Sequence, residues 1–448
     1  MPSGKTRWPA ALALLASLLG FAFGASSTLD YIQHLDRQVH DLHCSFIPGV
    51  DAAKGADTAC RAAMYSPYSA LFRDRLWGGI PISLFAVGAF AFFAAFALYV
   101  LLAGRSAPRR AAHFLLIAGV TPLLVSVGML ILSVLRLGSI CKTCAGIYAA
   151  STLLAVAGVA ALIVDRREAR AAPSATPAPP PPPPSTVTDP AAPGAVGPTI
   201  VDDAAPPAPP APPAPGRPRG SLLLLPAWLL ALGAFSITPA LLYASALPSY
   251  AGYIAGCGKL EKLTEANGAL LRIAGPGAVQ PATLFVDPLC PTCKSFHQRL
   301  AAEGLIEKLD ITLVLFPLDS ECNWMLDRPV HPGACLVSKA ILCSEHRAPA
   351  VLDWAYDNQD AILAAAKSGA GTANVQAMIR QRWPGLDACM DSKPTSQRLD
   401  RMLRYIIDNK LPVSTPQIYL GDTRLCDEDT DIGMPYAIRR LAPALRSK

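Results

Sequence analysis

Two cysteine pairs have the spacing that thiol chemistry uses: Cys141 with Cys144, and Cys290 with Cys293. Cysteines three positions apart on a helix share one face, so they can bridge each other or exchange with a third sulfur. The first pair precedes a run that is apolar over residues 149–164. Its reaction partner should therefore be lipid-soluble, and a quinone is the obvious candidate. A structural disulfide or half of a metal site is the alternative interpretation of this pair.

The second pair stands between a predicted strand and a predicted helix. Residues 282–287 form a run typical of a buried strand, and Phe296 and Leu300 continue a helical pattern after the cysteines. Strand, turn and CxxC at a helix start form the thioredoxin arrangement. The helix N-terminus should lower the pKa of Cys290 and make it the nucleophile, while Cys293 resolves the mixed disulfide. Zinc would require further ligands at suitable spacing, and none is obvious, so we expect no metal site.

A thioredoxin-like fold also requires a cis-proline that faces the dithiol. Thr415-Pro416, followed by the strand-like residues 417–420, is a better choice than Pro412. The preceding strand is predicted over 311–318, and most residues between it and this proline have a helical pattern. They should form a helical insertion.

Composition indicates a membrane protein in an oxidising compartment. The chain has 448 residues, of which 52% are apolar, and twelve cysteines with few zinc-like spacings. The net charge of +6 does not indicate nucleic-acid binding, because the basic residues gather beside apolar runs, as membrane orientation requires. The expected partners are therefore membrane lipid and a quinone, and no nucleic acid.

Five apolar runs predict membrane-spanning helices. They cover residues 9–24, 78–103, 114–135, 141–164 and 222–247. The first run has the flanks of a cleaved signal peptide, but we favour an uncleaved span because the later spans need a partner. The polar segment 30–76 holds Cys44 and Cys60 and belongs in water. Apolar residues at helical spacing from Ile32 to Leu42 predict either a short helix along the membrane face or a simple connecting helix.

Basic residues predict the orientation of these spans. They flank the start of the first span, the loop 104–110 and the end of the fourth span, and these places share one side if every span crosses. That side should be cytoplasmic. The four cysteines of the membrane half then face the opposite, oxidising side. The fifth span carries the remaining residues across to that side as well.

The sequence thus predicts a multidomain protein of the inner membrane, with an all-α bundle and an α/β thioredoxin-like domain that carries a helical insertion. The expected parts are a four-helix transmembrane domain (1–170) with a periplasmic loop (30–76), a Pro/Ala-rich cytoplasmic linker (171–220), a fifth transmembrane helix (221–247) and a periplasmic thioredoxin-like domain (248–448). The linker composition is that of an extended, semi-rigid spacer.

Six further cysteines should serve mainly as structural disulfides: Cys257, Cys322, Cys335, Cys343, Cys389 and Cys426. Six cysteines allow fifteen pairings. A bond between Cys322 and Cys335 is favoured, because these two are near in sequence and turn-like residues separate them. His297, shortly after the second dithiol, is interpreted as a surface side chain rather than a catalytic base.

Residues 9–165 resemble the vitamin K epoxide reductase family. The pattern comprises Cys44 and Cys60 in a loop, Ser66 six positions after the second, Trp-Gly-Gly-Ile-Pro at 77–81, and Cys141-Lys142-Thr143-Cys144 with Tyr148 four positions on. The rest of the chain, apart from the proline-rich linker, resembles the thioredoxin-like domain that bacterial members carry as a fusion after a fifth span.

The resemblance implies an order of electron transfer. Cys290 and Cys293 would oxidise reduced exported proteins, and Cys44 would take the electrons from this pair. Cys60 would then pass them to Cys141.

The resemblance also implies a quinone site in the bundle. Cys144 would lie nearest the ring of a ubiquinone or menaquinone, Tyr148 would hydrogen-bond a quinone oxygen, and Ser66 would line the same pocket. An aromatic side chain at the membrane interface is the alternative interpretation of Tyr148. Some animal members have an asparagine where this chain has the charged residues 73–75, which leaves the second hydrogen bond to the ring unassigned.

The expected function is disulfide formation in exported proteins, with a quinone as the electron acceptor. One alternative is a quinone or quinone-epoxide reductase that uses protein thiols as its reductant. Another is a pathway that carries cytoplasmic electrons outward, which would need a thiol on the cytoplasmic side, where the predicted topology places none. A third is a non-catalytic, membrane-anchored binding module stapled by disulfides.

Overall fold

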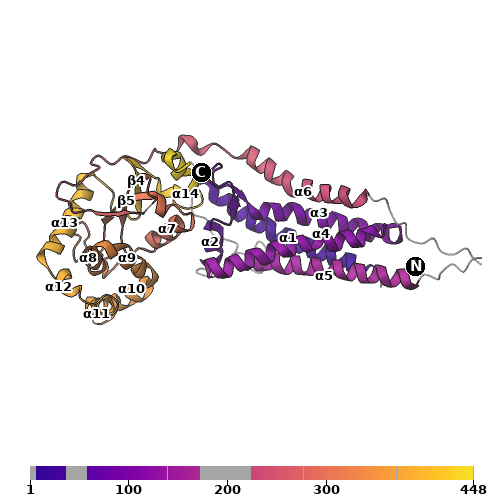
Figure 1. Cartoon of the computed structure of the whole chain (residues 1–448), viewed down its shortest axis with the longest axis horizontal. Helices are drawn as coiled ribbons and strands as arrows, with labels where there is room; N and C mark the ends of the chain where they lie inside the picture. Colours follow the sequence, from indigo (N-terminus) through magenta and orange to yellow (C-terminus); the bar gives the residue numbers. More distant parts are fainter. Residues whose placement is uncertain are drawn as a thin grey trace, which may run out of the picture.

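The chain folds into a bundle of long helices with an α/β region at one end of it (Figure 1). This computed structural model describes residues 7–36, 58–138, 140–171, 223–275, 277–369 and 371–446. The predictions for Cys44 and for the linker 171–220 fall outside the described residues, except for residue 171 at the end of a helix.

Five helices of the bundle are long and apolar enough to cross a membrane. They are α1 (Trp8–Gln33), α3 (Ile82–Ala103), α4 (Arg110–Leu132), α5 (Lys142–Ala171) and α6 (Leu224–Ala246). All five predicted spans are therefore present as helices. The short helix predicted from Ile32 onward is in part a continuation of α1, which runs to Gln33 and is followed by a 3₁₀ turn at His34–Asp36.

The second span begins four residues later than the apolar run suggests. Gly78 and Gly79 have φ values of +68° and +74°, a conformation that favours glycine. They are followed by the short strand β2 (Ile80–Pro81), which pairs with β1 (Ala70–Leu71). Pro81 is therefore the N-cap of α3.

Small residues and aromatic rings bring the bundle helices together. Gly88 of α3 lies against the backbone of α6 at Phe235, where a side chain of any size would clash. Close approach at small residues is the usual packing mode of helices in lipid, because no hydrophobic effect drives their association there. Phe96 packs edge-on against Trp228 of α6 at 5.1 Å between ring centroids. These contacts seat the fifth helix on α3.

The α/β region is built on a five-stranded sheet in the order β3-β5-β4-β6-β7. The strands are β3 (Leu271–Ala274), β4 (Gln280–Val286), β5 (Leu309–Leu315), β6 (Gln417–Leu420) and β7 (Thr423–Arg424). The central pair β4 and β5 is parallel, with Leu284 opposite Leu313, and the other pairings are antiparallel. Helix α7 (Pro291–Ala302) follows β4 and supplies the crossover to β5.

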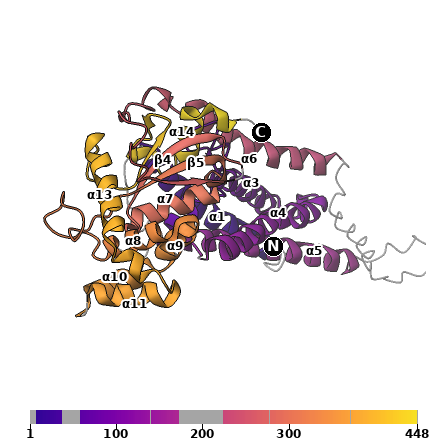
Figure 2. The ribbon, with the colours of Figure 1, turned by 60° about the vertical axis from the view of Figure 1, so that its left-hand side comes forward.

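Helices form the predicted insertion between β5 and β6. They are α8 (Ala334–Ser344), α9 (Ala348–Asp357), α10 (Gln359–Lys367), α11 (Thr372–Arg382), α12 (Asp387–Met390) and α13 (Lys393–Asp408), and α14 (Met434–Leu441) follows the last strand. In Figure 2 the insertion helices α8 to α11 lie below the sheet. Strand β3 and helix α14 were not predicted.

Three disulfides staple the α/β region: Cys257–Cys426, Cys322–Cys335 and Cys343–Cys389. The pairing predicted between Cys322 and Cys335 is confirmed, and the structure supplies the other two. Cys257 and Cys426 are 169 residues apart in sequence, so this bond ties the segment after α6 to the end of the sheet.

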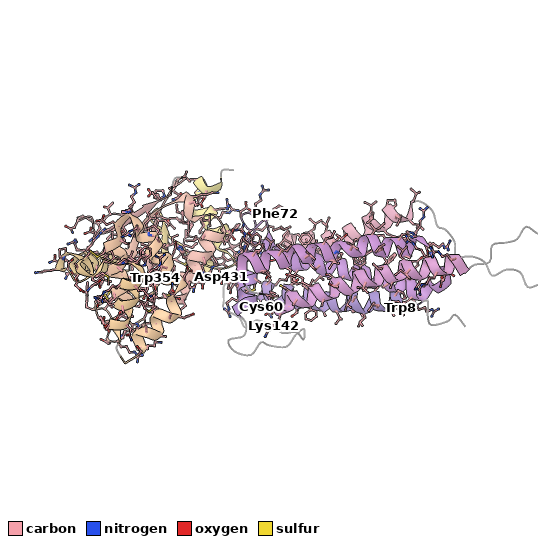
Figure 3. All side chains as sticks on the ribbon, turned by 60° about the horizontal axis from the view of Figure 1, so that its bottom comes forward. Trp8, Cys60, Phe72, Lys142, Trp354 and Asp431 are labelled. Atoms are coloured by element: carbon pink, nitrogen blue, oxygen red, sulfur yellow. A yellow bond between two sulfur atoms is a disulfide. The ribbon has the colours of Figure 1, made fainter. Side chains whose placement is uncertain are left out.

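The α/β region contacts the bundle through the turn between α2 (Thr58–Tyr65) and α3. Arg73 donates to Glu303 at 2.8 Å and to the backbone oxygen of Ser66 at 2.6 Å. Trp77 packs on Tyr436 and lies directly over Gly433. In Figure 3, Cys60, Phe72 and Asp431 lie at this junction and Trp8 lies near the opposite end of the bundle.

The basic ends of the helices gather at that opposite end. Arg7 lies against Gly104, and Arg109 forms an ion pair with Asp165 at 3.7 Å. The start of α1, the connection from α3 to α4 and the end of α5 therefore share one end of the bundle, as their charges predict.

Candidate active site

The first dithiol lies at the end of the bundle that faces the α/β region. Cys141 immediately precedes α5 and Cys144 is in its first turn. Both are free thiols. The Sγ of Cys141 lies 3.0 Å from the Sγ of Cys60 on α2 and 3.0 Å from the hydroxyl oxygen of Thr143. Cys60 is disulfide-bonded here, so a free thiol touches a disulfide sulfur, which is the arrangement that thiol–disulfide exchange requires.

A cavity collects the residues that the sequence assigns to this site. It measures about 160 Å³, and its lining includes Cys60, Cys141, Cys144, Ser66 and Tyr148. Lining residues that were not predicted come from all four helices α1, α3, α4 and α5 and from the segment around α2. Those on α1 and α4 are Ser27, Asp30, Tyr31, Val125, Ser126, Met129 and Leu132. Residues of the charged stretch 73–75 are not among the lining residues, and Arg73 turns instead to Glu303.

The cavity fits a quinone ring in size and in chemistry. A cavity of about 150 Å³ is large enough for one benzene molecule. Val125, Met129 and Leu132 offer an apolar wall on α4, while the hydroxyl groups of Tyr148 and Ser66 are polar groups of the lining. Pockets with an apolar wall and a few polar groups are typical of small-molecule sites.

The second dithiol opens α7, as predicted. Cys290 is the N-cap residue and Pro291 the first helical residue. The Thr415–Pro416 peptide bond is cis, and the backbone oxygen of Thr415 lies 3.6 Å from the Cys290 Sγ. The predicted cis-proline therefore stands beside the sulfur of Cys290.

Different surroundings separate the two thiols of this pair. Hydrogen bonds from the Cys293 thiol and backbone N–H lower the pKa of Cys290 to about 6, against the opposing effect of burial. Burial raises the pKa of Cys293 well above its ordinary value. Of the two thiols, Cys290 is therefore the one that ionises more readily, in agreement with its predicted role as the nucleophile.

The reactivity of Cys290 should titrate far below that of an ordinary thiol. In the reduced protein, the rate of Cys290 alkylation by iodoacetamide should rise with pH and level off above a midpoint near pH 6. Cys293 should stay unmodified over this range. The pKa of Cys290 is lower in the folded protein than in the unfolded chain, where it is about 8.5. The thiolate therefore adds to the free energy of unfolding of the dithiol form. This contribution is complete above about pH 8.5 and is lost as the pH falls through about 6. Mass spectrometry of the two cysteines measures this profile, and a Cys290 midpoint near 8.5 would contradict it.

Two polar residues beside this dithiol were not predicted. Asp287, three positions before Cys290, is completely buried, and His331 approaches its carboxylate at 2.7 Å. His297, by contrast, pairs with Asp353 of α9 at 2.9 Å and forms no hydrogen bond or ion pair with the dithiol among the described residues. The buried position of Asp287 at the end of a strand was the available signal, but nothing in the sequence connects it with His331.

These observations define the class of protein: a multi-pass membrane protein that carries a cysteine pair in its bundle and a second pair in a thioredoxin-like α/β region. Residues 11–159 match the model of the "Vitamin K epoxide reductase family". This part of the chain thus carries a domain that matches this family, and the match together with the two free dithiols supports a redox enzyme.

The solved structures that resemble the chain are similar to its α/β part. A thioredoxin-like oxidoreductase from Silicibacter pomeroyi DSS-3 is 13% identical with a TM-score of 0.26, and the match covers 41% of this chain and 95% of that one. The oxidoreductase DsbA from Xylella fastidiosa is 15% identical with a TM-score of 0.30, covering 38% and 89%. The catalytic domain of Proteus mirabilis ScsC is 20% identical with a TM-score of 0.28, covering 40% and 92%. No curated protein matches the chain.

Proposed function

We propose that this protein forms disulfides in exported proteins and passes the electrons through its bundle to a quinone. The observation that carries the proposal is the contact of 3.0 Å between the Cys60 and Cys141 sulfurs, beside a cavity that both line. A structural disulfide would not require a free thiol of a second cysteine pair at this distance. Each transfer is one exchange: two thiols become a disulfide, and the pair that receives the two electrons becomes two thiols.

The α/β region is the entry point for substrate thiols. Its Cys290–Cys293 pair would oxidise a reduced protein and then be reoxidised through Cys44, which lies outside the described residues. Cys60 would hand the electrons to Cys141. Because the Cys290–Cys293 pair is part of the same chain as the bundle, its effective concentration near the loop cysteines is raised without any new contact.

The bundle cavity is the place where the electrons leave the protein. A quinone bound there would accept two electrons and two protons. Cys144 would present its sulfur to the ring, the Tyr148 hydroxyl would orient a ring oxygen, and Ser66 would complete the polar lining. The apolar side chains of α4 would favour the quinone ring over water in the same space.

The arrangement of charges supports an orientation for the chain. The basic ends of the bundle would face the cytoplasm of a bacterial cell and both dithiols its periplasm. The four-helix domain would span 1–170, the linker 171–220, the fifth helix 221–247 and the thioredoxin-like domain 248–448. Reduced exported proteins are then the substrates within reach of Cys290.

A trapping experiment tests the order of transfer. Replacing Cys293 with serine removes the thiol that resolves mixed disulfides. The Cys290 thiolate should then attack the oxidised loop pair at Cys44, with Cys60 leaving as a thiol, and the bond between Cys290 and Cys44 should accumulate in membranes that contain a quinone to keep the loop pair oxidised. Non-reducing electrophoresis and mass spectrometry detect this bond. The double variant Cys290→Ser/Cys293→Ser is the control and should trap nothing. Accumulation of a bond from Cys290 to Cys141 instead would show that the loop cysteines are bypassed and would refute the proposed order.

A further inference from the structure

A buried carboxylate lies directly under the dithiol of the α/β region. Asp287 is completely buried. One of its oxygens accepts the backbone N–H of Leu289 at 2.7 Å, and its own backbone oxygen accepts the N–H of Cys290 at 3.2 Å. The carboxylate therefore holds the turn that presents the nucleophilic sulfur. A buried carboxylate is costly unless its charge is compensated.

The compensating group comes from a different part of the chain. The Nδ1 of His331 lies 2.7 Å from the second carboxylate oxygen of Asp287, which also accepts the N–H of Leu318 at 2.7 Å. The imidazole is itself mostly buried, with 14% of its side chain exposed. One carboxylate thus joins the dithiol turn to the loop that follows β5.

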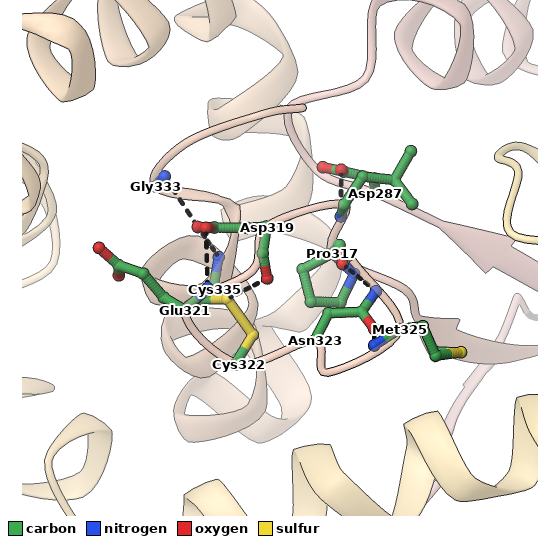
Figure 4. The surroundings of a disulfide bond; sticks show 10 residues. Asp287, Pro317, Asp319, Glu321, Cys322, Asn323, Met325, Gly333 and Cys335 are labelled. Atoms are coloured by element: carbon green, nitrogen blue, oxygen red, sulfur yellow. Dashed lines mark hydrogen bonds between the residues drawn. A yellow bond between two sulfur atoms is a disulfide. The ribbon is translucent and has the colours of Figure 1, made fainter. Parts of the chain in front are cut away.

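That loop is held rigidly. Asp319, also completely buried, accepts the backbone N–H groups of Gly333 at 2.9 Å and Cys335 at 3.2 Å. The Cys322–Cys335 disulfide closes the same loop, and Figure 4 shows Asp287 beside it. His331 lies between these anchors in sequence, so its position is fixed by the fold rather than by its contact with Asp287 alone.

Three charged groups act on the imidazole. Burial lowers the pKa of His331, but the hydrogen bond and charge of Asp287, together with the charge of Cys290, outweigh burial and raise it, while Lys367 of α10 opposes them. The charge of Asp287 in turn raises the pKa of Cys290. The charge states of Asp287, His331 and Cys290 therefore depend on one another.

We propose that His331 is a positioning residue of the redox centre: bonded to Asp287, it offsets the charge of the buried carboxylate and so keeps the Cys290 sulfur ionised near neutral pH. The two residues between the cysteines, Pro291 and Thr292, carry no positive charge that could do this. The inference rests on the redox role of Cys290 but not on the quinone step.

The test is the pH profile of Cys290 in a His331→Asn variant of the full chain. Asparagine keeps an N–H donor near the place of Nδ1 but has no positive charge. The midpoint of Cys290 alkylation should move up by about one pH unit, which lowers the rate at pH 6 about fivefold and leaves the plateau unchanged. Mass spectrometry of the Cys290 peptide separates this site from the other thiols. The matched control is His297→Asn, which removes the histidine of the exposed pair with Asp353 and should leave the midpoint unchanged.

An unshifted midpoint, or an equal loss of rate at every pH, would overturn the proposal, because a purely structural role predicts one of these results.

A second measurement needs no variant. In the unmodified protein labelled at its histidines, NMR should show a higher pKa for His331 in the dithiol form than in the disulfide form, because the Cys290 thiolate is present in the dithiol form only. Equal values in both forms would also overturn it. Neither result depends on turnover with a quinone.

Discussion

Replacing Cys290 with serine should abolish oxidation of reduced proteins and leave the bundle able to pass electrons from a small dithiol to a quinone. Serine cannot form a mixed disulfide, so the entry step has no nucleophile, and protein oxidation should fall on the order of a thousandfold or more. The Cys60–Cys141 contact and the cavity lie in a different part of the structure and keep their geometry. The two rates are measured separately in membranes, with a reduced unfolded protein in one assay and dithiothreitol in the other.

Two controls make this result specific. Ser295→Ala, an exposed position on the same helix, should alter neither rate. Cys144→Ser should show the reverse pattern, with one burst of protein oxidation limited by the disulfides already in the chain and no reduction of added quinone. If Cys290→Ser oxidised protein substrates at the normal rate, the α/β region would not be the entry point. If the quinone made no difference to protein oxidation, a separate quinone reductase would be the better description of the bundle.

The parts of the fold that the sequence predicts best are those with a local physical signal. Membrane spans follow from runs of apolar residues, and strand β6 was predicted at 417–420, the residues it occupies. The cis peptide before Pro416 could be placed because a strand and a dithiol leave few positions for it. The start of α3 was misplaced by four residues, since a hydropathy pattern does not show that Gly78 and Gly79 form a turn.

Contacts between segments that are distant in the sequence could not be predicted, because no local pattern of residues indicates them. Arg73 could be read only as part of a charged stretch, and folding pairs it with Glu303, 230 residues further on. The partners of Cys257 and Cys343 could not be chosen among the possible pairings. Residues 259–271 carry an amphipathic pattern, yet they form no helix, and β3 begins only at Leu271. The position of His331 beside Asp287 depends on a loop that several backbone hydrogen bonds and a disulfide shape together.

The ion pair between Arg73 and Glu303 should decide how firmly the α/β region docks on the bundle. Its two side chains are 5% and 13% exposed. Removing one partner of a buried pair strands the other charge and typically costs about 3–5 kcal/mol, whereas replacing both with apolar residues is often neutral. Arg73→Met and Glu303→Leu should therefore each loosen docking, and the double variant should restore most of it. Leucine removes the acceptor for Arg73 as well as the charge, whereas a protonated Glu303 loses the charge but keeps a carbonyl oxygen that can accept from Arg73.

Hydrogen exchange at the end of α7 and over α14 reports this equilibrium. The matched control is Arg272→Met, which breaks an ion pair with Asp310 in which the arginine is exposed and should leave exchange at the junction unchanged. Arg73 also donates to Ser66, so the double variant is compared with both single variants. A double variant as loose as Arg73→Met would show that the bond to Ser66, rather than the ion pair, carries the effect.

The same junction should give docking a dependence on pH. Burial raises the pKa of Glu303 despite the nearby Arg73, and it raises the pKa of Asp431 despite Arg299. A carboxyl whose pKa is raised in the docked state binds a proton more tightly there, so its contribution is complete below its ordinary value of about 4 and is lost as the pH rises through the raised one. Docking should therefore tighten on acidification, and Glu303→Gln, which mimics the protonated side chain, should weaken this dependence. Hydrogen exchange, corrected for its intrinsic pH dependence, measures both effects in the parent protein and in this variant. Looser docking at low pH would contradict the prediction. It would show that the attraction between the charged side chains outweighs the cost of burying the Glu303 carboxylate.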